Sequence, residues 1–505
     1  MKSFITTSGC SSTLLATVWL VLGLPLLGES LSMGYKYGRP RNGFMYPPPK
    51  PKGVTLPPDQ WFVQKLDHFN PTDTSTWSQR YFTNSSFYKP GGPVFLMIGG
   101  EGPANPIWMV EGAWIPYAER LNAYLISLEH RYYGKSHPTE DVSVENLVYL
   151  SSEQALADLA TFTVAMKEKL GLKDNKWIAF GGSYPGSLAA WYRLKYPHLV
   201  HGSIASSAPI VAQIDFREYL EVVRDALATV SEACNTAIKE ATRQLQLLMA
   251  HRVGWQNITK RFKLCVPLDG TKKLDVSNLF ATLAGYIEEV VQYNKDNRGF
   301  EGVKGVNITI ETLCNILMDE KKGPAIARYG EINDMFLALE GESCLDYTYD
   351  NMIKEFQATS WENNTDVGGR SWIYQTCTEF GFYQGSDSHE QPFGDEFPLQ
   401  FYTRQCQDIF GPRISPEVLN AGVRRTNAVY GGHDLKVTRV VFPNGSIDPW
   451  HALGVTSNIS DEATAIFIDG TAHCANMYPA STTDPPQLTQ AREKIFSLLQ
   501  KWLKD

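Results

Sequence analysis

The chain has 505 residues, of which 43% are hydrophobic and 20% are charged, so it can bury a globular core and is not a disordered chain. Its formal net charge of −8 argues against a nucleic-acid-binding protein, because such proteins carry a basic patch or stripe. No apolar run after the N-terminus reaches the roughly 18 residues of a membrane-spanning helix, which excludes a multi-span membrane protein.

The N-terminus predicts export. Residues 14–27 (LLATVWLVLGLPLL) are nearly all apolar and are followed by small residues. A run of about 14 residues is shorter than the roughly 20 of a spanning helix, so residues 1–30 are interpreted as a cleaved signal peptide, with a signal anchor as the alternative. Residues 31–60 are rich in proline and predict an extended leader or a short propeptide.

Cysteine usage also indicates an oxidising compartment. Six cysteines lie between residues 234 and 406 without any CxxC pair or zinc-like spacing, so we expect three disulfides whose pairing the spacing leaves open. Cys474 is left over. Sequons that permit glycosylation on the surface occur at Asn84, Asn257, Asn307, Asn363 and Asn458, and also at Asn444. We expect an extracellular location or the lumen of endosomes or lysosomes.

Compact apolar runs bounded by Gly, Pro, Asp or Asn predict buried parallel strands at 93–98, 123–128, 177–180, 203–205, 437–442 and 465–468. Helical periodicity predicts helices at 151–170, 184–196 and 486–503. This alternation indicates an α/β fold with a mostly parallel sheet.

One long segment breaks the alternation. Residues 213–405 have helical character at 219–248, 276–293 and 332–339, and they contain all six clustered cysteines. Apolar runs that predict buried strands resume after this segment. We therefore expect an α/β domain in two parts, 61–212 and 406–505, interrupted by a disulfide-pinned helical insertion at 213–405.

Ser183 is the candidate nucleophile. An apolar strand leads into Gly181-Gly-Ser-Tyr-Pro-Gly186 and directly into an Ala/Leu-rich helix. A serine at a strand–turn–helix junction is held on a tight turn, and the helix N-terminus offers amide groups to an oxyanion. The match to G-x-S-x-G is imperfect because Pro185 replaces the last glycine, but proline is tolerated in a first helical turn. A glycine-rich turn that merely starts a helix is the alternative.

The candidate acid and base follow two later strands. Asp448 lies in the loop after 437–442, and His473 lies in the loop after 465–468. Each could be an ordinary loop residue, but the order Ser, Asp, His is that of α/β hydrolases. We expect His473 to take the serine proton and Asp448 to orient the ring. The expected oxyanion donors are the backbone amides of Tyr184 and Gly100.

These stretches resemble the S28 serine peptidases, the family of prolyl carboxypeptidase and dipeptidyl peptidase 7. The resemblance runs from about residue 61 to the C-terminus and is carried by 99–102 (GGEG), 129–134 (EHRYYG), 181–186 (GGSYPG), 206–209 (SSAP), 374–379 (YQTCTE), 444–450 (NGSIDPW) and 470–473 (GTAH). It implies an α/β-hydrolase domain with a helical cap, and the same triad. It also implies disulfides that pair Cys234 with Cys314, Cys265 with Cys344, and Cys377 with Cys406.

The resemblance further implies a preference for bonds near proline. Trp450 stands where the family places a pocket wall, and the other candidate substrate-binding residues are Ser187, Phe382 and Glu379. At Ser187 and near Phe382 the proline-specific members carry methionine, so the pocket walls differ. Cys474 stands where those members have a second histidine, which suggests sensitivity to thiol reagents. Glu379 is a candidate for binding a substrate amine, with a buried structural carboxylate as the alternative.

The expected function is thus a secretory-pathway serine peptidase with exopeptidase-like activity on peptide substrates. An esterase or lipase on the same fold, or a catalytically weak peptide-binding homologue, are the alternatives. No cofactor is expected, and no metal, because the chain has neither an HExxH motif nor a Cys/His ligand cluster. No nucleic-acid partner and no membrane attachment after signal cleavage are expected. A homodimer like that of the family is one expectation.

Overall fold

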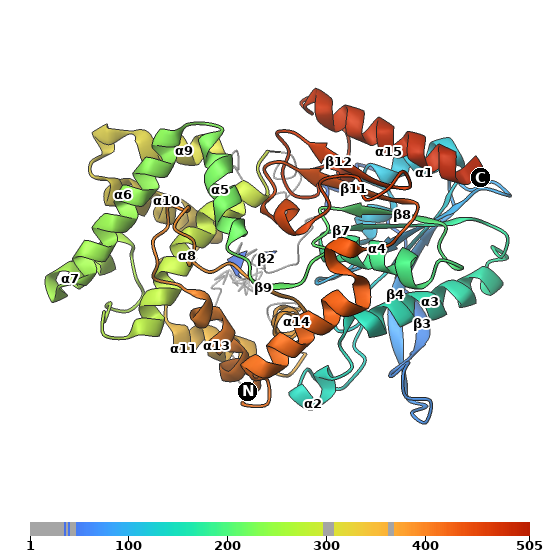
Figure 1. Ribbon diagram of the computed structural model, residues 1–505, viewed down its shortest axis with the longest axis horizontal. Helices are drawn as coiled ribbons and strands as arrows, with labels where there is room; N and C mark the ends of the chain where they lie inside the picture. Colours follow the sequence, from blue (N-terminus) through green and yellow to red (C-terminus); the bar gives the residue numbers. More distant parts are fainter. Residues whose placement is uncertain (1–34, 37–38, 41–46, 296–307, 362–367, 505) are drawn as a thin grey trace, which may run out of the picture.

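The computed structural model describes residues 47–295, 308–361 and 368–504, together with the backbone of two short strands, β1 (Tyr35–Lys36) and β2 (Arg39–Pro40). The expected signal peptide and the sequons at Asn307 and Asn363 lie outside the described residues. The chain forms two lobes that meet along the middle of the molecule (Figure 1).

One lobe is built on an eight-stranded sheet of order β12-β11-β8-β7-β5-β6-β4-β3. Its strands are β3 (Gln60–Lys65), β4 (Thr76–Asn84), β5 (Val94–Ile98), β6 (Tyr124–Leu128), β7 (Trp177–Gly182), β8 (Gly202–Ser206), β11 (Val440–Gly445) and β12 (Ala463–Ile468). β4 is antiparallel to both of its neighbours, and all other pairs are parallel. This is the expected α/β-hydrolase fold.

Burial explains which strands the sequence revealed. All five residues of β5 are buried, because helices cover both faces of the sheet there, and such strands read as unbroken apolar runs. β3 and β4 form the antiparallel edge, carry polar residues and escaped prediction. One face is covered by α1 (Trp114–Leu121) and α15 (Pro486–Lys504), and the other by α3 (Ser152–Lys169) and α4 (Tyr184–Lys195).

The second lobe is the cap. Its helices are α5 (Glu218–Ala228), α6 (Glu232–Met249), α7 (Arg252–Arg261), α8 (Lys273–Gln292), α9 (Ile310–Met318), α10 (Ala325–Glu340), α11 (Tyr349–Gln357), α12 (Gly369–Gln375) and α13 (Leu399–Phe410). The single helix expected at 219–248 was wrong. Ser231 has extended backbone and its hydroxyl accepts a hydrogen bond from the Ala233 amide, so it begins a new helix, α6.

Two short strands and one helix connect the lobes. β9 (Gln213–Asp215) leaves the sheet domain and pairs in parallel with β10 (Gly381–Tyr383), which follows the π-helical turn η4 (Thr376–Phe380). The expected boundary between residues 405 and 406 falls inside α13, and a helix is a single rigid unit, so the chain returns to the sheet only beyond α13. α14 (Pro416–Tyr430) then packs on η4 before β11 begins.

A short helix, α2 (Val144–Leu147), lies between β6 and α3 in the chain of the sheet domain.

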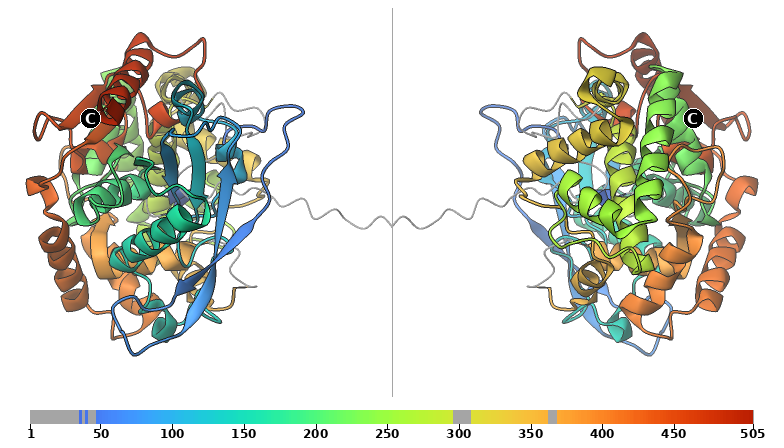
Figure 2. Two further views of the ribbon diagram at one scale, coloured as in Figure 1. Left: turned by 90° about the vertical axis from the view of Figure 1, so that its right-hand side faces the viewer. Right: turned by 90° about the vertical axis from the view of Figure 1, so that its left-hand side faces the viewer.

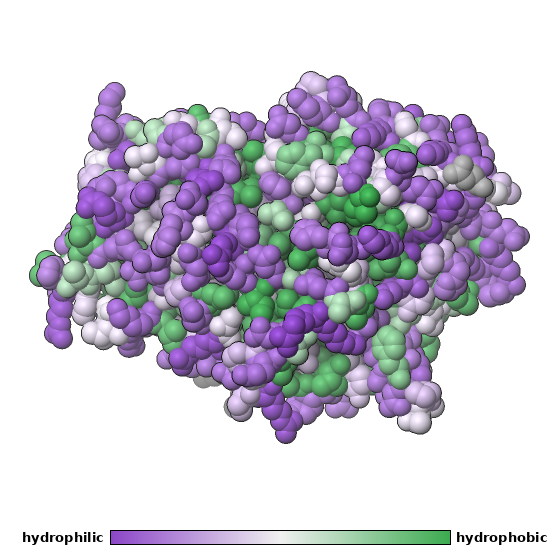
Figure 3. Space-filling model, in the orientation of Figure 1, coloured by the Kyte–Doolittle hydropathy of each residue, from purple (hydrophilic) through white to green (hydrophobic). Residues whose placement is uncertain are grey.

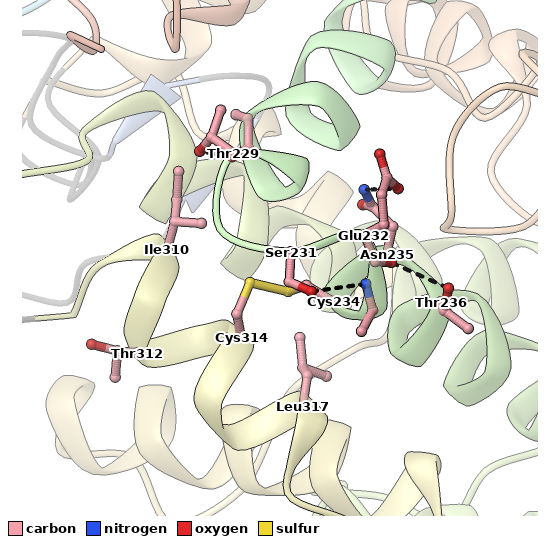
Figure 4. Close-up of a disulfide and its surroundings, with 12 residues drawn as sticks. Thr229, Ser231, Glu232, Cys234, Asn235, Thr236, Ile310, Thr312, Cys314 and Leu317 are labelled. Carbon is pink, nitrogen blue, oxygen red and sulfur yellow. Dashed lines mark hydrogen bonds between the residues drawn. A yellow bond between two sulfur atoms is a disulfide. The ribbon is translucent and has the colours of Figure 1, made fainter.

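Three disulfides pin the cap, and they pair as the resemblance implied. Cys234 on α6 is bonded to Cys314 on α9, as Figure 4 shows. The other bridges join Cys265 to Cys344 and Cys377 to Cys406. The last one ties η4 to α13, so it fixes the segment of the cap that lies next to the sheet domain. Cys474 is free and buried.

The lobes keep their separate characters in side view. The left view of Figure 2 faces the sheet domain, and the right view faces the helices of the cap. The outer surfaces of both lobes are largely hydrophilic, and apolar residues gather towards the middle of the face in Figure 3. Among the described residues, none of the helices combines the length and the apolarity that crossing a bilayer requires.

Candidate active site

Ser183 stands on a strained turn between β7 and α4. Its backbone has φ 62° and ψ −134°, a conformation that costs a non-glycine residue of order 1–3 kcal/mol and persists only where the surroundings enforce it. The backbone of α4 packs so tightly against this turn that a Cβ on Gly181 would lie 2.0 Å from the Pro185 carbonyl oxygen. The Ser183 amide donates to the Ser206 carbonyl at the end of β8. The expected sharp strand–helix elbow is therefore present.

The two residues expected to bind an oxyanion lie side by side. Tyr184 is the first residue of α4, so its amide is one of those that have no acceptor within the helix. Gly100 packs directly on the first turn of the same helix, because a Cβ there would lie 2.2 Å from Cγ of Pro185. The loop after β5 and the N-terminus of α4 thus form one site.

His473 and Asp448 form a buried pair. Nδ1 of His473 lies 2.9 Å from Oδ1 of Asp448, and both side chains are fully buried. The same carboxylate oxygen accepts a hydrogen bond from the Trp450 amide, which holds it at the start of the turn η6 (Pro449–Leu453). Burial alone would lower the pKa of the His473 imidazole, but the charge of Asp448 and the adjacent Cys474 raise it. This arrangement stabilises an imidazolium.

Hydrogen bonds from β8 join the loop of Ser183 to the loop of His473. The Ser206 carbonyl accepts from the Ser183 amide at 2.9 Å, and the Ser206 hydroxyl accepts from the Asn476 side chain at 2.8 Å. The Ser207 hydroxyl accepts from the Cys474 amide at 2.9 Å. The carboxyl ends of β7, β8, β11 and β12 therefore meet at one edge of the sheet, where an open α/β sheet places its functional groups.

An aromatic wall adjoins this edge. The Trp450 ring is buried and lies 5.3 Å from the ring of Phe382, nearly perpendicular to it, and 6.5 Å from the His473 ring. Phe216 and Tyr219 from the cap contact the same indole at 5.4 and 5.8 Å. Two of the four expected substrate-binding residues, Trp450 and Phe382, are thus brought together beside the imidazole.

Gln292, at the end of cap helix α8, is a site residue that sequence reasoning missed. Its Oε1 accepts hydrogen bonds from Trp450 Nε1 at 2.8 Å and from the Tyr219 hydroxyl at 2.7 Å. Its backbone carbonyl accepts from the His473 amide at 2.9 Å. One glutamine therefore connects the cap, the aromatic wall and the histidine loop. No motif surrounds it, and its partner Trp450 is 158 residues away along the chain.

The other two expected substrate-binding residues have different surroundings. The Ser187 hydroxyl is buried on α4 and donates to the Pro209 carbonyl at 2.8 Å. The Glu379 carboxylate accepts hydrogen bonds from the amide and hydroxyl of Ser152 and from the Gln375 side chain. The Glu379 carboxylate thus binds the N-terminus of α3, as a buried structural carboxylate does. Burial raises its pKa.

A buried network of hydrogen bonds surrounds the Tyr184 hydroxyl. His130 Nδ1 faces the Arg131 carbonyl at 2.7 Å and so carries the proton, which leaves Nε2 to accept from the Tyr184 hydroxyl at 3.0 Å. Gln375 donates to the same hydroxyl at 3.1 Å, and its amide oxygen accepts from the Tyr133 hydroxyl. Burial lowers the pKa of His130 to about 4, so the ring is neutral. This network anchors the residue after the nucleophile to the cap.

The described sequons differ in exposure. Asn257 and Asn458 are exposed, whereas Asn444 is buried within β11. The Asn84 side chain is half-buried, and its nitrogen donates to the Met109 carbonyl at 2.8 Å. Asn257 and Asn458 are therefore the better placed glycan acceptors of these four.

The family model for serine carboxypeptidase S28 matches residues 64–495. The chain belongs to the S28 family. This S28 protein is 36% identical over 466 residues to the thymus-specific serine protease of Mus musculus, covering 89% of this chain and 88% of that protein. It is 30% identical over 463 residues to the lysosomal Pro-X carboxypeptidase of Homo sapiens, covering 88% of each. It is a serine-type peptidase.

Solved structures of other hydrolases are more distant from the S28 chain. The proline iminopeptidase of Mycobacterium smegmatis is 10% identical with a TM-score of 0.36, covering 88% of this chain and 99% of that one. A soluble variant of the monoglyceride lipase of Saccharomyces cerevisiae is 10% identical with a TM-score of 0.36, covering 90% and 99%.

Proposed function

We propose that this S28 protein is a secretory-pathway serine exopeptidase that cleaves peptides through an acyl-enzyme. In this proposal Ser183 is the nucleophile, His473 the general base and Asp448 the group that orients the imidazole. The observation that carries it is the buried 2.9 Å contact between His473 Nδ1 and Asp448 Oδ1, tied through β8 to the strained elbow of Ser183. A serine on a strained elbow, with an aspartate-bound histidine on a loop hydrogen-bonded to the same strand β8, supports the arrangement that activates a hydroxyl for attack.

The proposed chemistry has two halves. The Ser183 Oγ attacks the carbonyl carbon of the scissile bond while His473 takes its proton, and Asp448 stabilises the resulting imidazolium. Amides of Tyr184 and Gly100 hydrogen-bond the oxyanion of the tetrahedral intermediate. The imidazolium then protonates the departing amine, the C–N bond breaks, and an ester to Ser183 remains. Water, deprotonated by His473, hydrolyses that ester and regenerates the hydroxyl.

A preference near proline is supported by the aromatic wall. Trp450 and Phe382 present flat apolar surfaces at nearly right angles, which suits the rigid pyrrolidine ring. A protein named lysosomal Pro-X carboxypeptidase is among the relatives.

The proposed compartment follows from the disulfides. Three bridges form and persist in an oxidising environment, such as the extracellular space or the lumen of the secretory pathway. The apolar N-terminal run and the lysosomal relative agree with this location.

The test combines labelling with substrate profiling. A fluorophosphonate probe should label the wild-type enzyme and not the Ser183→Ala variant. Peptides with proline near either terminus should be cleaved, and cleavage sites read by mass spectrometry should lie near chain ends. Hydrolysis of p-nitrophenyl esters without any peptide cleavage would contradict the proposal in favour of an esterase. Equal labelling of both proteins would contradict Ser183 as the nucleophile.

A further inference from the structure

The carboxyl end of β8 is tied through its backbone to the loop of Ser183 and to the strand that leads to Asp448. The Ser206 carbonyl accepts a hydrogen bond from the Ser183 amide at 2.9 Å. The next amide, that of Ser207, donates to the Pro443 carbonyl at 2.8 Å. Pro443 lies in β11, and Asp448 follows that strand. Two consecutive residues of β8 and its end thus connect the candidate nucleophile to the strand of the candidate acid.

The third loop, that of His473, is tied to the same place by a side chain. The Ser207 hydroxyl is buried and accepts a hydrogen bond from the Cys474 amide at 2.9 Å. The preceding amide, that of His473, donates to the Gln292 carbonyl of the cap at 2.9 Å. The backbone that carries the imidazole is therefore held from two sides, by the cap at one residue and by the sheet domain at the next.

Both residues joined by the hydroxyl have left-handed backbone. The angle φ is 45° at Ser207 and 58° at Cys474, values that are uncommon for residues other than glycine. Ser183 has a positive φ of 62° as well, so strained residues from three segments are linked at this edge of the sheet. Such strain persists only where the surroundings enforce it, and it clusters at sites where exact placement serves function. A strained serine at this position therefore indicates a role for its placement and not for packing alone.

We propose that Ser207 is a positioning residue that holds the loop of His473 at the distance from Ser183 that proton transfer requires. The proposal rests on the proposed peptidase function and adds a residue to its catalytic arrangement. Asp448 orients the imidazole ring through the contact with Nδ1, whereas Ser207 fixes the backbone from which the ring projects. The two residues thus control different degrees of freedom of the same base.

Three variants separate a positioning role from a structural one. Ser207→Ala removes the hydroxyl that accepts from the Cys474 amide. Ser207→Gly removes it too, but glycine adopts left-handed backbone without strain. Ser203→Ala is the matched control, because Ser203 is a buried serine of β8 whose hydroxyl has no hydrogen-bond partner among the described residues.

The expected effect is on the rate of the chemical step. Ser207→Ala should lower kcat by about 10- to 100-fold, because misplacing a catalytic group by about 1 Å can cost about 100-fold. KM should stay within about twofold, since the affected step is proton transfer and not substrate binding. Fluorophosphonate labelling should slow by the same factor as kcat, because it also requires the Ser183 proton to reach His473. Ser203→Ala should keep the wild-type rates.

Stability is measured on the same proteins, because a structural role predicts that activity follows it. Ser207→Gly should lose as much kcat as Ser207→Ala, although its melting temperature should equal or exceed that of Ser207→Ala. Wild-type kcat in either variant overturns the proposal, and so does a rise in KM at unchanged kcat. Losses of kcat that follow the melting temperatures across the three variants also overturn it, in favour of a structural role.

A second tie between β8 and this loop keeps the test decisive if neither Ser207 variant folds. The Asn476 side chain donates to the Ser206 hydroxyl at 2.8 Å. Asn476→Ala should then lower kcat with KM kept, and an unchanged kcat contradicts the proposal. Absence of both labelling and turnover in the wild type would instead overturn the peptidase mechanism itself.

Discussion

The sheet domain and the cap are stabilised in different ways, and they contribute differently to the candidate site. The sheet domain has buried parallel strands, covered on both faces, and supplies Ser183, Asp448 and His473 from loops at strand ends. The cap has helices tied by three disulfides, and it supplies Gln292, Phe216 and Tyr219 to the wall beside His473. In the proposed function, the sheet domain therefore carries the chemistry and the cap shapes the wall beside it.

The largest expected effect concerns the sheet domain alone. Ser183→Ala should reduce kcat by about four to six orders of magnitude, because the nucleophile and its activation are lost together. Asp448→Asn should cost about 10⁴-fold by disturbing the imidazole tautomer. Steady-state turnover of a peptide substrate measures both, with circular dichroism to check the fold. Losses of less than tenfold would assign the chemistry to other residues.

Removing a cap disulfide should affect the cap first. The double substitution Cys234→Ala and Cys314→Ala opens a link that spans 80 residues, and it should lower the free energy of unfolding by about 2–5 kcal/mol. Limited proteolysis should then cut α6 or α9 before the sheet domain, with fluorophosphonate labelling of Ser183 retained. Simultaneous loss of labelling and of the cap would mean that the two lobes unfold as one unit.

Gln292→Leu tests whether the cap selects the substrate. The change removes the Oε1 that accepts hydrogen bonds from Trp450 Nε1 and from the Tyr219 hydroxyl, and losing a buried hydrogen bond costs about 1–3 kcal/mol. We expect kcat/KM for proline-containing peptides to fall about tenfold, as the indole shifts, while the rate of fluorophosphonate labelling changes little. A loss of labelling as large as the loss of peptide turnover would place Gln292 in the chemistry.

Stability should depend on pH through the cap. Burial raises the pKa of Glu288 on α8 from 4.5 to about 8. Between these values the folded protein holds a proton that the unfolded chain has released, so the free energy of unfolding should fall with rising pH, by at most about 1.4 kcal/mol per unit from this group. Melting curves at pH 5, 6, 7 and 8 measure the slope. Glu288→Gln should flatten it and the exposed Glu342→Gln should not; an unchanged slope in Glu288→Gln rejects this origin.

The smallest expected effect concerns Cys474, next to His473. A small thiol reagent such as methyl methanethiosulfonate should inactivate the wild type slowly, because the thiol is buried. Cys474→Ser should keep activity within a few-fold and resist the reagent. If the variant is inhibited as fast as the wild type, the sensitive group lies elsewhere.

Local patterns in the sequence were enough to predict six of the eight strands of the sheet and to single out the three candidate triad residues. Each buried strand reads as a short apolar run, and Ser183, Asp448 and His473 each follow one closely, so neighbours along the chain mark their positions. The strands β3 and β4 were missed because polar residues interrupt their apolar pattern, and in β4 the polar residues Gln79 and Arg80 are themselves buried. The break between α5 and α6 was missed because a single cap, Ser231, decides it.

Only the tertiary structure decided what each polar side chain serves. Glu379 and Glu101 were both acidic residues in family-like motifs, yet one meets the N-terminus of α3 and the other lines a pocket beside Gly100. Gln292 joined the site through partners far away in the chain. The physical reason is one of distance along the chain. Hydrophobic periodicity and turn-forming residues depend on neighbours in the sequence. The hydrogen-bond partner of a buried polar group instead depends on which distant segment folds against it.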